Sequence, residues 1–166
     1  MQARSIRHPL PYRGRLPAPA IERLAALEEV RQRLLAHPEY AEYHAVLTPA
    51  FLSSVRLEVG TRLARVVLRT VALGRHVGGV VPAAVTLGPL VCFDAAFYAP
   101  ETPAGLALLA HEAVHVWQWQ QRGLLPFAWS YLREFLAAGY EAISYERAAA
   151  TVEQWVREAL EARGRV

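Results

Sequence analysis

The segment His111-Glu112-Ala113-Val114-His115 carries the residue types that bind and use a catalytic metal ion. Residues four apart lie on one face of an α-helix, so the two imidazoles can share one tetrahedral metal ion. Glu112 follows His111 directly and points about 100° around the helix, where its carboxylate can reach a water rather than the metal itself. If the segment is helical, its spacing predicts two metal ligands and one general base.

The flanks of this segment predict a helix over 104–121. Thr102 suits the N-cap position, and Pro103 suits the first helical position, where a missing N–H costs nothing. No proline interrupts the helix, and Gly123 favours its end. The side chains around the histidines are apolar on nearly every side, so we expect the helix to run through the core. Two histidines inside such a helix need polar partners, which a metal ion would provide.

A catalytic zinc site uses a third protein ligand and keeps one position for water. The carboxylates on the two following segments are Glu134, Glu141 and Glu146. Glu134 falls on a predicted amphipathic helix and could face solvent, whereas Glu141 lies in the turn after Gly139. Glu146 lies in the first turn of the last predicted helix, a rigid position that suits a ligand. Residue types and spacing leave all three open.

The remaining pattern predicts an α+β fold in which a small mixed sheet packs against several helices. Alternation over 54–59 predicts a strand, and the apolar runs 84–87 and 90–93 around Gly88-Pro89 predict a β-hairpin. Further helices are expected over 21–36, 39–47, 62–73, 127–138 and 144–162. Residues 1–18 are rich in proline and arginine and predict an extended arm, which leaves one domain over 19–166.

The composition favours a cytoplasmic protein that does not bind nucleic acid. All 18 basic residues are arginine, the net charge is only +3, and the arginines of 4–15 and 56–75 lack an aromatic platform. We therefore expect them to lie on solvated faces. Glycine and proline interrupt the uncharged run 77–93, which predicts a buried hairpin rather than a membrane span. Cys92 is the single cysteine and is expected to be a small buried hydrophobe.

The stretch AAVTLGPLVCFDAAFYAPETPAGLALLAHEAVHVWQWQ resembles zinc metallopeptidase domains of bacteria. Those domains belong to the zincin group, and some occur beside toxin or contractile-injection modules. The downstream segment GYEAISYERAA resembles the part of that family that supplies the third ligand. The resemblance spans roughly 55–150 and implies a zincin-like, gluzincin-type site in which Glu146 joins His111 and His115 to bind Zn²⁺. The departures at Ala113 and Ser144 touch no ligand.

These features predict a zinc-dependent metallopeptidase, a hydrolase in which Glu112 is the base and a peptide or protein is the substrate. The alternative is a non-catalytic zinc-binding or protein-interaction module that retains the same site. The resemblance to zincins further implies that strand 90–93 is the sheet edge that holds an extended peptide, and Gln118 could orient a metal ligand. The candidate oxyanion donors are Tyr140, Tyr145 and His76, although packing or surface roles fit each of them better. The oligomeric state is left open.

Overall fold

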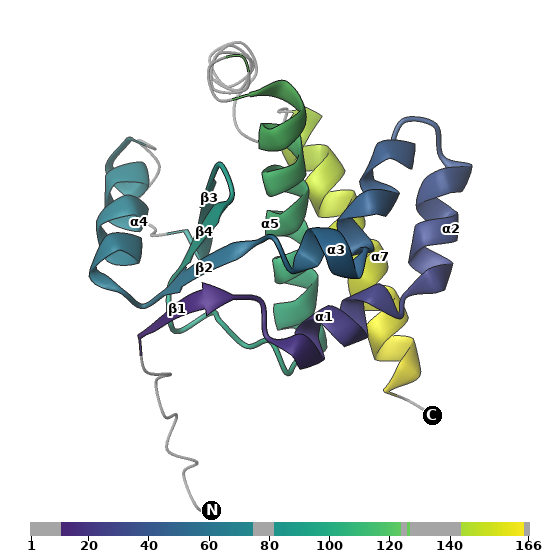
Figure 1. Ribbon diagram of the computed structural model, residues 1–166, viewed down its shortest axis with the longest axis horizontal. Coiled ribbons are helices and arrows are strands. Elements are labelled where there is room, and N and C mark those ends of the chain that lie inside the picture. Colours follow the sequence, from purple (N-terminus) through teal and green to yellow (C-terminus); the bar gives the residue numbers. More distant parts are fainter. Residues whose placement is uncertain (1–10, 75–81, 124–125, 127–143, 165–166) are drawn as a thin grey trace, which may run out of the picture.

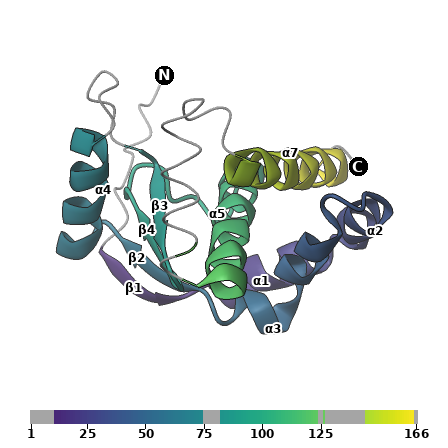
Figure 2. The same cartoon turned by 90° about the horizontal axis from the view of Figure 1, so that it is seen from above.

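The computed structural model describes residues 11–74, 82–123, 126 and 144–164 (Figure 1). In chain order the elements are β1 (Tyr12–Arg15), α1 (Ala18–Ala25), α2 (Glu28–Ala36), the 3-10 helix η1 (Ala41–Leu47), α3 (Pro49–Leu52), β2 (Arg56–Val59), α4 (Arg62–Gly74), β3 (Ala84–Leu87), β4 (Leu90–Phe93), α5 (Pro103–Arg122) and α7 (Ser144–Arg163). The fold is α+β, with one small mixed sheet and several helices, as predicted. Figure 2 shows α4 on one side of the sheet and α5 on the other.

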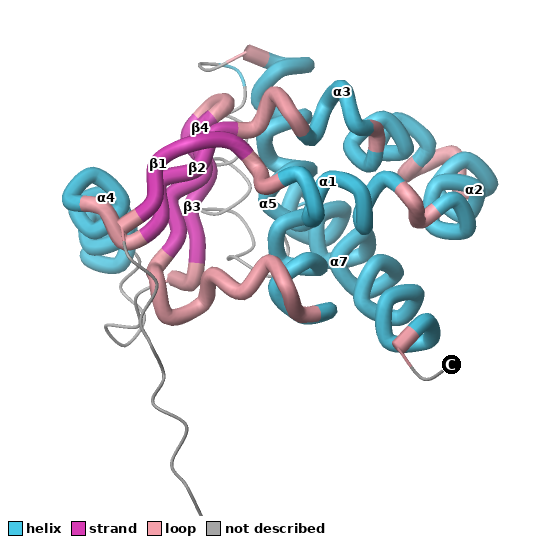
Figure 3. Tube along the Cα trace, turned by 60° about the horizontal axis from the view of Figure 1, so that its bottom comes forward, coloured by secondary structure: helices cyan, strands magenta, loops and turns pink. Residues whose placement is uncertain are grey.

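The sheet has four strands in the order β1-β2-β4-β3, which lie side by side in Figure 3. Strands β2 and β4 are parallel, whereas β1 and β3 run antiparallel to their neighbours. The expectation that 90–93 is the sheet edge is therefore wrong, because β4 pairs on both sides. Its side chains are almost entirely buried, as in an inner strand, whereas those of β3 are only half-buried and β3 forms the edge.

Alternation along the strands assigns side chains to the two faces of the sheet. Leu57 and Val91 are register partners and belong to the main core, together with many residues of α5. Glu58 and Cys92, one position further, are partners on the opposite face, which α4 covers. Thr86 pairs with Val91 and so points toward α5. This register brings a polar residue of the edge strand to the helix that carries both histidines.

The N-terminal third differs from its predicted form. Within the segment expected to be an extended arm, Tyr12–Arg15 pairs with β2, and Arg13 forms an ion pair with the buried Glu58. The helix expected over 21–36 is broken between α1 and α2. Leu27 lies at the break and is fully buried, so the bend lets it reach the core. Two glutamates then open α2, where the helix dipole favours them.

Helix α5 forms as the sequence predicts and is the central element of the core (Figure 1). The Thr102 hydroxyl accepts a hydrogen bond from Gly105 N at 3.0 Å, which caps the first turn. Gly123 follows the last turn with φ of 75°, a left-handed conformation that glycine adopts readily. Helix α7 packs along α5. The helix predicted over 127–138 lies outside the described residues.

The remaining expectations about burial agree with the structure for Cys92 but not for the hairpin, because β3 is only half-buried. Cys92 is a buried free thiol. Burial, followed by the charges of Glu58 and Glu112, raises its pKa to about 11, so it is neutral and packs as a small apolar side chain. Residues 84–93 form the predicted hairpin. Among the described residues, no helix is both long and apolar enough to cross a membrane.

Candidate metal centre

The two histidines of α5 and Glu146 of α7 meet at one point of the helix pair. His111 Nε2 lies 3.2 Å from His115 Nε2. Glu146 Oε2 lies 3.6 Å from His111 Nε2 and 3.5 Å from His115 Nε2. The four-residue spacing aligns the imidazoles, and the first turn of α7 carries the carboxylate to them. Each residue thus offers one donor atom to a common point.

This arrangement fits a zinc ion. Nitrogen and oxygen ligands about 2.0–2.1 Å from one tetrahedral zinc lie about 3.3 Å from one another, close to the separations found here. The exposed fractions of the side chains are 15% for His111, 9% for His115 and 11% for Glu146, so the donors are largely shielded from solvent. Two imidazoles and one carboxylate suit zinc better than magnesium or calcium.

Glu146 was one of three candidate third ligands. It lies with His111 and His115 in a group whose ligand atoms could hold one metal ion, here called the donor group. The assignment of these residues to zinc stays a prediction. Glu134 and Glu141 lie outside the described residues, so the structure does not compare them with Glu146. Within the described residues, three side chains could hold a metal ion at this point.

The buried side-chain amide of Gln118 holds the His115 ring at Nδ1, the nitrogen that does not face His111. Gln118 Nε2 lies 3.2 Å from the backbone oxygen of Tyr145, which can only accept, so the amide nitrogen must face Tyr145. The amide oxygen therefore faces His115, and Oε1 lies 2.9 Å from Nδ1. Nδ1 must then carry the imidazole proton, which leaves the lone pair of Nε2 for a metal. Gln118 thus has the orienting geometry that the sequence predicted.

A second carboxylate of α7, Glu153, contacts His111 from the side opposite the donor atoms. Its Oε2 lies 3.0 Å from Nδ1, without the alignment of a full hydrogen bond, and Arg157 Nη2 lies 2.6 Å from its Oε1. Glu153 is not among the residues predicted from the sequence. Glu153 lies seven positions after Glu146, which places both on one face of a helix, and this spacing was the available signal.

The electrostatics of this group favour a positive charge at its centre. Burial by itself lowers the pKa of His111. The nearby carboxylates of Glu146 and Glu153, with the negative charge of Glu112, outweigh burial and raise the pKa to about 10. Contact with His111 in turn lowers the pKa of Glu153. Because metal binding displaces protons from its ligands, a divalent cation would compete with a proton for His111.

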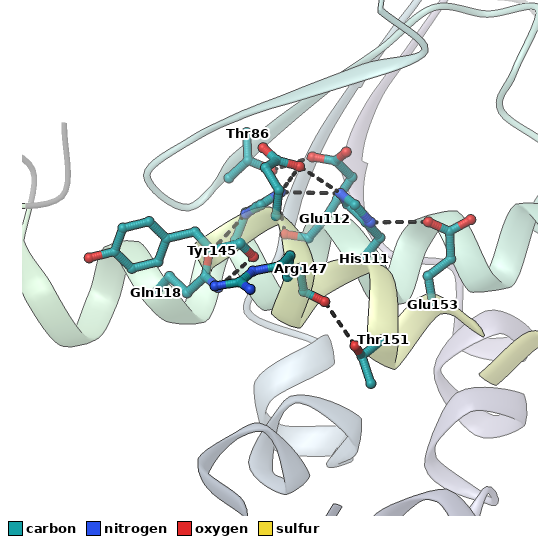
Figure 4. Close-up of polar contacts among 10 residues, drawn as sticks. Thr86, His111, Glu112, Gln118, Tyr145, Arg147, Thr151 and Glu153 are labelled. Carbon is teal, nitrogen blue, oxygen red and sulfur yellow. Dashed lines mark hydrogen bonds and ion pairs between the residues drawn. The ribbon is translucent and has the colours of Figure 1, made fainter. Parts of the chain in front are cut away.

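Glu112 is buried beside the donor group and is held by the edge strand. Thr86 Oγ1 on β3 donates a hydrogen bond of 2.6 Å to Glu112 Oε2. Figure 4 shows Thr86, Glu112 and His111 gathered above α5. Thr86 is not among the predicted residues either, although a hydroxyl among the apolar side chains of β3 is a weak signal. The contact orients the carboxylate and leaves its other oxygen available.

Tyr145 is the one candidate oxyanion donor that the structure describes, and its phenol does not face the two histidines and Glu146. The Tyr145 ring lies 5.0 Å from the Arg122 guanidinium and points away from His111 in Figure 4. Its backbone oxygen, rather than its phenol, serves the site through Gln118. Tyr140 and His76 lie outside the described residues.

Comparison with known proteins gives one match. Residues 46–123 match the family described as the eCIS core domain, which is linked to extracellular contractile injection systems. No curated protein and no solved structure matches the chain. The zincin resemblance therefore rests on the motif residues. Over the part that builds β2, α4, the hairpin and the histidine helix, the chain is similar to the eCIS core domain family.

Proposed function

We propose that this protein is a zinc-dependent metallopeptidase. The observation that carries this proposal is the meeting of three donor atoms at 3.2 to 3.6 Å beside the buried carboxylate of Glu112. Structural zinc sites are normally closed by four protein ligands. The described residues supply three, which fits an open, catalytic site.

In this reaction His111, His115 and Glu146 would hold the metal, and Glu112 would move the proton. A bound zinc would lower the pKa of a water toward neutrality and polarise the substrate carbonyl. Glu112 Oε2 accepts from Thr86, so Oε1 is the oxygen that takes the proton of the attacking water. The same oxygen then delivers the proton to the leaving amine, which completes hydrolysis of the amide.

The edge strand β3 is the proposed support for the substrate. It pairs with β4 on one side only among the described strands, and its Thr86 contacts Glu112. An extended peptide can add to such an edge through backbone hydrogen bonds, with its scissile bond next to the catalytic base. This geometry favours an unfolded segment of a peptide or protein as the substrate.

A non-catalytic interaction module is the second candidate function. The similarity to the eCIS core domain favours protein partners, and it does not by itself require turnover. In this case the zinc would stabilise the α5–α7 pair, and Glu112 would have no chemical role. A cytoplasmic location stays a prediction under either function.

Zinc content and cleavage of a diverse peptide pool separate the two functions. We expect wild type to hold about one zinc per chain and to cleave peptides. Glu112→Gln should keep zinc but lose cleavage, because it keeps the shape and removes the base. Thr86→Val should keep zinc and lower cleavage by up to about 150-fold, since a hydrogen bond to a charged group contributes roughly 1.5–3 kcal/mol. Zinc-loaded wild type that cleaves nothing would favour the interaction module.

The ligand assignment has its own test. Glu146→Ala should lose zinc, whereas Glu134→Ala and Glu141→Ala should retain it. Elemental analysis of protein purified without chelators measures this directly. Loss of zinc from Glu141→Ala or Glu134→Ala, with retention by Glu146→Ala, would show that another carboxylate closes the site.

A further inference from the structure

Helix α4 covers one face of the sheet and leaves its own outer face exposed. Ala64 and Leu68 are buried against the strands. The opposite side carries six exposed residues: Arg62, Leu63, Arg65, Val66, Arg69 and Thr70. Figures 1 and 2 show α4 at the flank of the molecule, with the sheet between it and α5. This outer face is therefore remote from the metal centre.

The exposed residues of α4 form two parallel rows. At 100° per residue, Arg62, Arg65 and Arg69 fall within an arc of about 60° and form a basic row. Leu63, Val66 and Thr70 occupy the adjoining arc of about 60° and form an apolar row. Leu63 is 42% and Val66 is 62% exposed, so the apolar row is accessible. A row of charges beside accessible aliphatic groups is unlike a uniformly solvated surface.

The arginines of the basic row lack acidic partners in the described part of the chain. No acidic residue occurs within α4. The ion pairs of the described residues join other arginines to their glutamates and leave these three out. Three like charges on one helix face repel one another, and carboxylates from another molecule would relieve this.

We propose that the outer face of α4 docks a helix of a partner protein that presents carboxylates beside small apolar residues. The basic row has the spacing i, i+3, i+7 and spans about 10.5 Å, which a second helix can match residue for residue along its own axis. The apolar row provides the contact that this pairing buries. The inference goes beyond peptide hydrolysis, because a partner on α4 leaves the metal centre on the other side of the sheet open.

Other classes of partner fit these rows less well. Helices that bind membrane surfaces use large apolar residues such as tryptophan and phenylalanine, and this row has only Leu63 and Val66 as apolar anchors. Single-stranded nucleic acid needs aromatic platforms beside its basic groove, and the α4 face has none. Arginine beside aliphatic contacts is typical of protein interfaces.

A helix-stabilised peptide can serve as the probe. It carries glutamates at i, i+3 and i+7 beside an alanine and leucine row, and a control peptide has the same residues on scattered faces. Binding to the full chain is measured by calorimetry at low and moderate salt. We expect the patterned peptide to bind at least tenfold more tightly than the scattered peptide, with weaker binding as salt rises.

Variants locate the binding surface. Arg65→Gln/Arg69→Gln should weaken binding of the patterned peptide at least tenfold, and Leu63→Ser/Val66→Ser should weaken it at both salt concentrations. The control Arg31→Gln/Arg147→Gln removes the same charge outside α4 and should change binding by less than about twofold. All of these side chains except the partly exposed Arg31 are exposed, so circular dichroism should show intact folds.

Three results would overturn the proposal. Equal binding of the two peptides, or equal loss in the α4 and control variants, would indicate unspecific charge attraction. Tighter binding to phosphatidylserine vesicles or to oligonucleotides than to the patterned peptide would assign the surface to a membrane or a nucleic acid. These outcomes do not depend on zinc or on cleavage, so they leave the proposed peptidase function separately testable.

Discussion

Replacement of Glu153 by glutamine tests whether the second carboxylate of α7 tunes the metal centre. Glu153 Oε2 lies 3.0 Å from His111 Nδ1, and Glu153 binds no metal in the proposed arrangement. Glutamine keeps the length of the side chain and an accepting oxygen but removes the negative charge. We expect weaker zinc binding, because a carboxylate behind a metal-binding histidine fixes its ring and raises its basicity.

The size of this loss follows from the environment of Glu153. Removing such a partner typically lowers metal affinity by about 10- to 100-fold, or roughly 1.4–2.7 kcal/mol. The Glu153 side chain is 22% exposed, and its carboxylate also forms an ion pair of 2.6 Å with Arg157. Both features weaken the influence of the carboxylate on His111, so we expect a loss near the lower limit, about tenfold.

Competition between the protein and a chromophoric zinc chelator measures the affinity at fixed pH and salt. Glu158→Gln is the matched control, because Glu158 lies on the same helix and pairs with Arg33 at the surface. This control should change the zinc dissociation constant by less than about twofold. Unchanged affinity in Glu153→Gln would refute the role of the carboxylate. An equal loss in Glu158→Gln would instead indicate a general effect of charge on α7.

Two further predictions concern the framework around the site. Gly105→Ala should lower the free energy of unfolding by about 1–3 kcal/mol, because a Cβ there would lie 1.9 Å from the backbone oxygen of Ala99. Urea unfolding measures this, and an unchanged midpoint would contradict the close approach. Cys92 should resist thiol reagents at pH 8 until the protein is denatured, because burial raises its pKa to about 11. The stability that this neutral thiol contributes is present below pH 9, the pKa of the thiol in the unfolded chain, and is lost as the pH rises through 11. Fast labelling of Cys92 in the folded protein would contradict its buried environment.

The sequence predicted those features that depend on neighbours within a few residues. Thr102, Pro103 and Gly123 mark the ends of α5, and the helical repeat then aligns His111 with His115. The turn at Gly88 likewise follows from local preference and closes the hairpin. The break between α1 and α2 could not be predicted in this way, because apolar spacing continues through Leu27 and only the packing of that side chain requires a bend.

Only the tertiary structure decided which elements lie together at the site. Periodicity marks 90–93 as a strand, but long-range pairing makes β4 an inner strand and β3 the edge. That pairing turns Thr86 toward Glu112, and the packing of α7 on α5 brings Glu146 and Glu153 to opposite sides of His111. Backbone geometry repeats over a few residues and can be read along the chain, whereas these contacts depend on which apolar faces pack together once the core forms.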